Sequence, residues 1–271
     1  MNKEIQKVLV LDIDGTLTNS DKKITEATRQ GIINIQERGH IVILASGRPT
    51  SGMKRYAKEL ELEKFGGYLL SYNGAKITNC KTKEIIFQQT LPSNVVPEIY
   101  QFAQEYDCGV ITYVEDCIIS GRRIDQYLEL ESKINDLPMK LVDDFEEYQN
   151  FDINKCLLTA DPELAIRYEK KLQEAFKGIL SIYRSEPFFI EIMPLNIDKA
   201  TSLDKMLASV GLTRENAICC GDGFNDMTMI QYAGLGVAME NAQPAIKEAA
   251  DYITKSNNED GIAHVIDKFI L

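Results

Sequence analysis

Short apolar runs alternate with amphipathic stretches in the first quarter of the chain. The runs at residues 8–11, 41–45 and 68–71 are almost wholly apolar, which is typical of strands buried on both faces of a sheet. Apolar or small side chains recur at helical spacing within residues 24–35, and a second amphipathic stretch passes through residues 53–60. Strands that alternate with helices in this way predict parallel strands joined by crossover helices.

The same alternation returns in the last quarter of the chain. Residues 217–220 and 235–238 are predicted strands, and residues 227–233 form a predicted helix between them. Two further amphipathic stretches, at 244–250 and 262–269, predict helices that complete the layer. Both ends of the chain are therefore expected to build one α/β sheet.

The middle of the chain has a different pattern, more polar and more often alternating. Residues 75–78 and 84–88 could pair as a hairpin. Amphipathic helices are predicted at 95–106 and 162–176, and strands at 110–114, 117–120, 155–159 and 188–192. This change of pattern predicts a second, α+β domain inserted into the first.

Composition and charge narrow the classes of function. The chain has 271 residues, with 44% hydrophobic and 26% charged residues and a formal net charge of -11. That charge argues against nucleic acid and anionic membranes as partners, because both attract Lys and Arg clusters. The six cysteines show no C-x-x-C spacing, and no signal peptide or apolar span of membrane length stands out. We therefore expect free thiols and a cytoplasmic location.

Three polar clusters follow three of the predicted parallel strands. They occupy residues 12–16, 46–49 and 221–226. In an open α/β sheet, ligands bind outside the carboxyl ends of the strands, so clusters distant in sequence are expected to meet there.

The first and third clusters contribute carboxylates. Asp12 and Asp14 are two residues apart at a strand end, and Asp222 supplies a third acidic group. Such a group of carboxylates needs a cation, and all-oxygen ligands favour Mg²⁺ over Zn²⁺. A calcium-binding EF-hand loop is excluded because Leu17 and Lys23 stand where it requires Gly and Glu.

Nucleotide-binding loops are also excluded. Gly47 and Gly52 have the Walker spacing, but Met53 stands where Lys is required. The glycines of 221–226 and 234–239 lack the third Gly of a dinucleotide fingerprint. An acidic protein that binds phosphate still needs a local cation, and Lys199, at the start of an amphipathic stretch, is a candidate.

The motifs together resemble the haloacid dehalogenase superfamily, in its Cof-like branch of sugar-phosphate phosphatases. Its four motifs correspond, in order, to residues 12–17, residues 46–48, Lys199 and residues 221–226. Segments 71–75, 237–242 and 258–261 are similar to that branch as well. The resemblance implies a doubly wound, mostly parallel, Rossmann-like core formed by residues 1–82 and 192–271, with residues 83–191 as an inserted α+β cap that sets substrate specificity.

The resemblance also implies a reaction and a cofactor. Asp12 would attack the phosphorus and form an aspartyl-phosphate. Asp14 would first be a general acid and then a base, so its pKa is expected to be raised. Mg²⁺ would be held by Asp12, the backbone carbonyl of Asp14, and Asp222, with Asp226 in support. The residues expected to bind substrate are Ser46, Gly47, Arg48, Lys199 and Asn225.

Several alternatives stay open at this point. The predicted function is hydrolysis of a small phosphomonoester, but a phosphotransferase or phosphomutase would use the same intermediate. A non-enzymatic, metal-dependent binding protein is a third possibility, against which the intact Asp12 and Asp14 argue. Arg48 could bind substrate or pair with a nearby carboxylate. Glu191 is more often a structural partner than an acceptor for a substrate hydroxyl.

Overall fold

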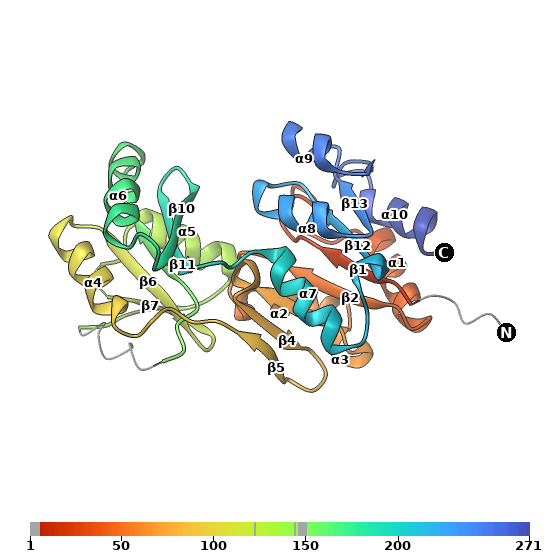
Figure 1. Ribbon diagram of the computed structural model, residues 1–271, viewed down its shortest axis with the longest axis horizontal. Coiled ribbons are helices and arrows are strands. Elements are labelled where there is room, and N and C mark those ends of the chain that lie inside the picture. The colour runs from red at the N-terminus through yellow and green to blue at the C-terminus, as the bar shows by residue number, and fades with distance from the viewer. Residues whose placement is uncertain (1–5, 122, 144, 146–150) are drawn as a thin grey trace. The chain divides into compact units, whose positions relative to one another are not determined.

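The structure, a computed structural model, describes residues 6–121, 123–143, 145 and 151–271. It divides into two compact units, one formed by Met1–Phe87 with Asp198–Leu271 and the other by Gln88–Ile197 (Figure 1). None of the helices among the described residues is both long and apolar enough to cross a bilayer.

The first unit contains an eight-stranded sheet in the order β14-β13-β12-β1-β2-β3-β4-β5. The pairs from β14 to β3 are parallel, and β4 runs antiparallel to β3. This sheet and the helices around it confirm the predicted doubly wound α/β fold. In chain order the strands are β1 (Val8–Leu11), β2 (Ile41–Ala45), β3 (Tyr68–Ser71), β4 (Lys76–Asn79), β5 (Ile85–Gln88), β12 (Ala217–Gly221), β13 (Leu235–Ala238) and β14 (Tyr252–Ile253).

Helices cover both faces of this sheet, which explains why its central strands are apolar throughout. Leu9 and Leu11 of β1 pack into one core with α1, α2 and α10, whereas Val8 and Val10 pack into another with α7. The helices of this unit are α1 (Glu26–Glu37), α2 (Thr50–Glu59), α3 (Leu62–Phe65), α7 (Lys199–Ser209), α8 (Met227–Tyr232), α9 (Pro244–Ala249) and α10 (Gly261–Phe269).

The second unit has its own six-stranded sheet, in the order β10-β11-β9-β6-β7-β8. Its core lies between that sheet and helices α4 and α6. The strands are β6 (Gly109–Val114), β7 (Cys117–Ser120), β8 (Met139–Leu141), β9 (Cys156–Thr159), β10 (Leu180–Glu186) and β11 (Phe189–Pro194), and the helices are α4 (Val95–Glu105), α5 (Gln126–Asn135) and α6 (Pro162–Ala175). Of these, α5, β8 and β10 were not predicted.

Two expectations about single side chains can be answered within the fold. All six cysteines are free, as expected, and Cys219 and Cys220 are buried. Glu191 forms a buried ion pair with Lys155, 2.9 Å between Oε2 and Nζ, and accepts a hydrogen bond from Ser185. Glu191 is therefore a structural partner in this unit.

Candidate active site

The three polar clusters do meet at the carboxyl edge of the larger sheet. Asp12 follows β1, Ser46 follows β2 and Asp222 follows β12, and these three strands are parallel neighbours. The amide of Asp12 donates to the carbonyl of Cys220, which extends the pairing of β1 and β12 to the point where the site begins.

Lys199 lies at the centre of the site, at the first residue of α7, and is 1% exposed. Its Nζ donates to Asp12 Oδ1 at 2.8 Å, to Asp226 Oδ1 at 2.6 Å and to the carbonyl of Ala45 at 2.9 Å. These acceptors use all three donors of an ammonium group. Burial alone would lower the pKa of Lys199, but Asp12 and Asp226 raise it above its ordinary value, so the lysine is charged.

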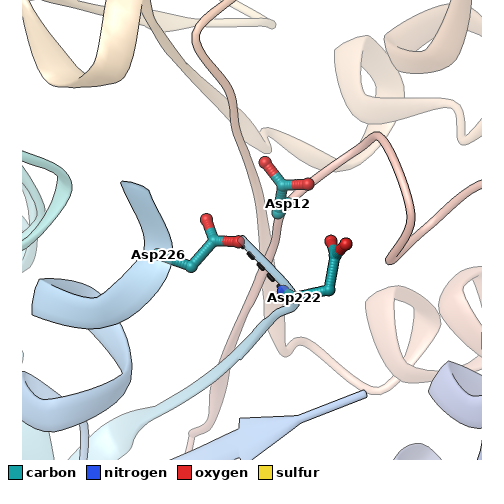
Figure 2. A group of neighbouring side chains, drawn as sticks. All are labelled: Asp12, Asp222 and Asp226. Atoms are coloured by element: carbon teal, nitrogen blue, oxygen red, sulfur yellow. Dashed lines mark hydrogen bonds between the residues drawn. The ribbon is translucent and has the colours of Figure 1, made fainter. Parts of the chain in front are cut away.

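Three carboxylates lie close together here, and two of them contact Lys199. Asp12, Asp222 and Asp226 each offer an oxygen, and these oxygens lie within 4.8 Å of one another (Figure 2). Burial, reinforced by Asp226, raises the pKa of Asp12 well above its usual range despite Lys199. Burial, again with Asp226, raises the pKa of Asp222 to about 6. The cluster therefore holds more negative charge than its lysine balances.

A divalent cation with oxygen ligands fits this arrangement. Three carboxylates against one ammonium leave a double negative charge when all are ionised. The backbone of Gly15 lies directly against Asp222, where no side chain would fit. A Cβ on Gly15 would lie 2.4 Å from Asp222 Oδ2. Thr16 Oγ1 donates to Asp222 Oδ1 at 2.8 Å and orients that carboxylate.

Asp226 supports the cluster, because its oxygens already have partners. Oδ1 accepts from Lys199, and Oδ2 accepts from the amides of Asp222 and Gly223, each at 3.0 Å. Its side chain is fully buried. Asp12 and Asp222 are consequently the carboxylates best placed to hold a cation. The backbone carbonyl of Asp14 stays a prediction.

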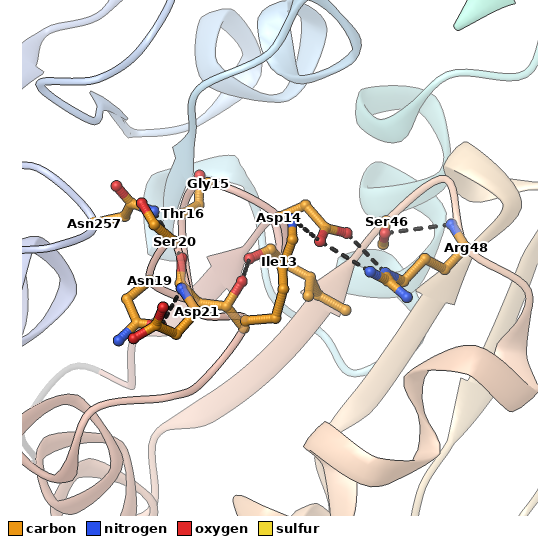
Figure 3. Close-up of polar contacts among 12 residues, drawn as sticks. Ile13, Asp14, Gly15, Thr16, Asn19, Ser20, Asp21, Ser46, Arg48 and Asn257 are labelled. Atoms are coloured by element: carbon orange, nitrogen blue, oxygen red, sulfur yellow. Dashed lines mark hydrogen bonds and ion pairs between the residues drawn. The ribbon is translucent and has the colours of Figure 1, made fainter. Parts of the chain in front are cut away.

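The carboxylate of Asp14 has different neighbours from that of Asp12, because β1 ends at Leu11 and the chain turns. Arg48 donates to it from Nε at 2.7 Å and from Nη2 at 2.9 Å (Figure 3). Lys22 also donates to it, from Nζ at 2.9 Å. The ion-pairing alternative for Arg48 is thus observed, and Arg48 itself is buried.

The expected rise in the pKa of Asp14 is wrong for this arrangement. Burial would raise that pKa, but the hydrogen bonds and charges of Arg48 and Lys22 outweigh it and lower the pKa to about 2. Asp14 is therefore ionised here, which suits a base. To act as an acid, it must first lose contact with Arg48.

The remaining predicted substrate-binding residues lie on the neighbouring loops. Ser46 is buried, and its hydroxyl accepts from the amide of Arg48 at 3.3 Å. Asn225 is exposed after β12 and donates from Nδ2 to Asn73 Oδ1 at 3.2 Å. Gly47 approaches the same Asn73 side chain, since a Cβ on Gly47 would lie 3.2 Å from Asn73 Oδ1.

Sequence patterns did not identify two of the polar contacts of the site. Lys22 lies in a polar turn with no periodicity or motif to mark it, although it bonds Asp14. The hydroxyl of Thr16 was part of a recognised motif, but only the structure shows that it bonds Asp222.

The chain is similar over nearly its whole length to known phosphatases and hydrolases. A family model described as "haloacid dehalogenase-like hydrolase" matches residues 9–266. The putative phosphatase YxeH of Bacillus subtilis is 31% identical over 98% of each chain. A crystal structure of a haloacid dehalogenase-like hydrolase from Bacteroides thetaiotaomicron is 44% identical, with a TM-score of 0.94 over 97% of this chain and 98% of the other. A structure described as a sugar phosphatase of HAD subclass IIB is 25% identical, with a TM-score of 0.82 over 97% and 99%.

Proposed function

The chain belongs to the haloacid dehalogenase-like hydrolase family and is a phosphoric monoester hydrolase, and we propose that it uses Mg²⁺ and an aspartyl-phosphate on Asp12 to hydrolyse small phosphomonoesters. The observation that carries the proposal is the buried Asp12 held by Lys199 beside Asp222. Sugar phosphates are the proposed substrates, which the likeness to a sugar phosphatase supports.

Asp12 supplies the nucleophile in this proposal. Lys199 holds Oδ1, and we assign Oδ2 as the attacking atom. As the bond from Oδ2 to phosphorus forms, the bond from phosphorus to the ester oxygen breaks and the alcohol leaves. Water then adds to phosphorus, the bond to Asp12 breaks, and free phosphate is released. Lys199 balances negative charge at the attacking group throughout.

Asp14 handles the protons at the leaving group. Arg48 is proposed to turn from Asp14 to the substrate phosphate, and the freed carboxylate can then take up a proton from solvent and give it to the alcohol. Asp14 takes a proton back from water in the second step. Ser46 and Asn225 are proposed to donate hydrogen bonds to the phosphoryl oxygens, and Gly47 leaves them room.

Asp12 and Asp222 would hold Mg²⁺, with the backbone carbonyl of Asp14 as a further ligand. When bound, the ion would supply charge neutralisation for the transferring phosphoryl group. The six free cysteines support a cytoplasmic location, where thiols are kept reduced. The net charge of -11 fits a small-molecule partner rather than nucleic acid or a membrane surface.

The test is phosphate release from an aryl phosphate and a panel of sugar phosphates, with Mg²⁺, Mn²⁺ or EDTA. Wild type is expected to need a divalent ion, and Asp12→Asn to lose at least roughly a thousandfold in rate, because an amide is not a nucleophile. Asp267→Asn, an exposed change on α10, is the matched control and should retain activity. Full activity of Asp12→Asn would exclude the aspartyl-phosphate, and transfer of phosphate to an added sugar without free phosphate would indicate a phosphotransferase.

A further inference from the structure

The turn that follows β3 has an unusual backbone. Tyr72, Asn73 and Gly74 lie in succession with φ of 51°, 52° and 105°. Residues with a side chain adopt this left-handed region reluctantly, Asn less so than Tyr. Two such residues in a row persist only where the surroundings hold them, and strain of this kind gathers at functional sites.

Three hydrogen bonds, from the loop after β2 and from α7, hold this turn. The amide of Tyr72 donates to the carbonyl of Arg48 and that of Asn73 to the carbonyl of Ser46, each at 2.9 Å. Ser202 Oγ, from the helix that begins with Lys199, donates to the carbonyl of Gly74 at 2.8 Å. The strained backbone therefore fixes the loop that carries Ser46 and ties it to α7.

The side chain of Asn73 extends this link to the third loop. Its Oδ1 accepts the hydrogen bond from Asn225 Nδ2, and its amide lies against Gly47. An Nδ2 group has two hydrogens, so this bond uses one and leaves the second. Through this hydrogen bond, Asn73 determines which end of the Asn225 amide points toward it.

We propose that Asn73 is a positioning residue for phosphate binding, which orients the Asn225 amide so that its second N–H donates to a phosphoryl oxygen. This inference rests on the proposed phosphatase function. It differs from a purely structural role, in which Asn73 only tolerates a left-handed backbone. Glycine would serve that structural role fully, because it adopts positive φ at no steric cost.

Asn73→Gly separates the two roles, because it keeps the backbone and removes the amide. Its melting temperature is expected to stay within about 2 °C of wild type, since relief of strain offsets the added chain entropy. Lys83→Gly, at φ 62° in the exposed turn between β4 and β5, is the control for that exchange. Inorganic phosphate, titrated calorimetrically in Mg²⁺, should bind Asn73→Gly roughly five- to tenfold more weakly, as expected for one lost hydrogen bond, and Lys83→Gly like wild type.

A double-mutant cycle gives the second readout. Asn225→Ala should weaken phosphate binding, and adding Asn73→Gly should weaken it no further if Asn73 acts through Asn225. Asn73→Ala, which removes the same amide, should reproduce the loss, and it decides the question should Asn73→Gly fail to fold. Unchanged phosphate binding in these variants, or additive losses in the cycle, would overturn the inference. Absence of turnover in wild type with intact phosphate binding would instead overturn only the proposed function.

Discussion

Replacement of Asp226 by Asn tests the buried cluster most directly, because nearly every neighbour of that carboxylate is a donor. Lys199 donates to Oδ1, and the amides of Asp222 and Gly223 donate to Oδ2. An asparagine amide has one accepting oxygen and one donating nitrogen. Whichever way it turns, its NH₂ group faces at least one N–H, and no water can reach the fully buried side chain to compensate.

The cost follows from these contacts. Removal of one partner of a buried ion pair destabilises a protein by about 3–5 kcal/mol. Two features place Asp226→Asn near the lower value: Lys199 keeps Asp12 and the Ala45 carbonyl, and the repulsion that Asp226 exerts on Asp12 is removed. A loss of about 3 kcal/mol corresponds to a fall in melting temperature of roughly 6–12 °C for a domain of this size.

Differential scanning calorimetry in EDTA measures this fall, and it can resolve a separate transition for each unit. Asp198→Asn is the matched control. Asp198 is half-buried and caps α7 by accepting from the amide and hydroxyl of Thr201. Asparagine caps helices about as well as aspartate does. The Thr201 hydroxyl can accept from the asparagine amide instead of donating, so a change in melting temperature below about 2 °C is expected. A fall for Asp226→Asn no larger than that of the control would refute the geometry described for this carboxylate.

Three further predictions concern neighbouring groups. Burial and Asp226 raise the pKa of Asp222 to about 6, so the folded protein keeps a proton that the unfolded chain releases near pH 4. In EDTA the melting temperature should therefore fall as pH rises from about 4 to 6, and Asp222→Asn should flatten that slope. Gly15→Ala should destabilise more than Gly39→Ala in the same calorimetry, because both sites have positive φ but only Gly15 lies against Asp222, and equal effects would contradict that contact. Burial raises the pKa of the Cys80 thiol to about 12, so mass spectrometry should find alkylation at pH 8 on half-buried Cys117 and not on Cys80 until the protein is denatured.

The sequence predicted the sheet and the meeting of the motifs well, for a physical reason. Strands such as β1 and β2 are buried on both faces, so their apolar runs are unbroken and easy to recognise. The carboxyl ends of parallel strands share one edge, so the positions of Asp12 and Asp222 in the chain already imply that they are neighbours.

The elements that escaped prediction have a different kind of surface. The buried side of α5 carries polar Glu131 and Asn135 beside Leu128, and Asn135 Nδ2 donates a hydrogen bond to Glu131 Oε1. Hydrophobic periodicity cannot reveal a helix whose buried face is polar. In the site, the motif spacing predicted that Asp14 lies near Asp12. It could not predict the direction of the Asp14 side chain, which depends on Arg48 and Lys22.

The central position of β1 also bears on how the chain is made. Leu9 of β1 lies opposite Val42 of β2 on one side and opposite Ile218 of β12 on the other. At the usual pace of a ribosome, roughly 10–40 seconds separate the synthesis of these two strands. The backbone edge of β1 that faces β12 has no native partner during that interval. Nascent chains halted before β12 are therefore the form of this protein most dependent on chaperones.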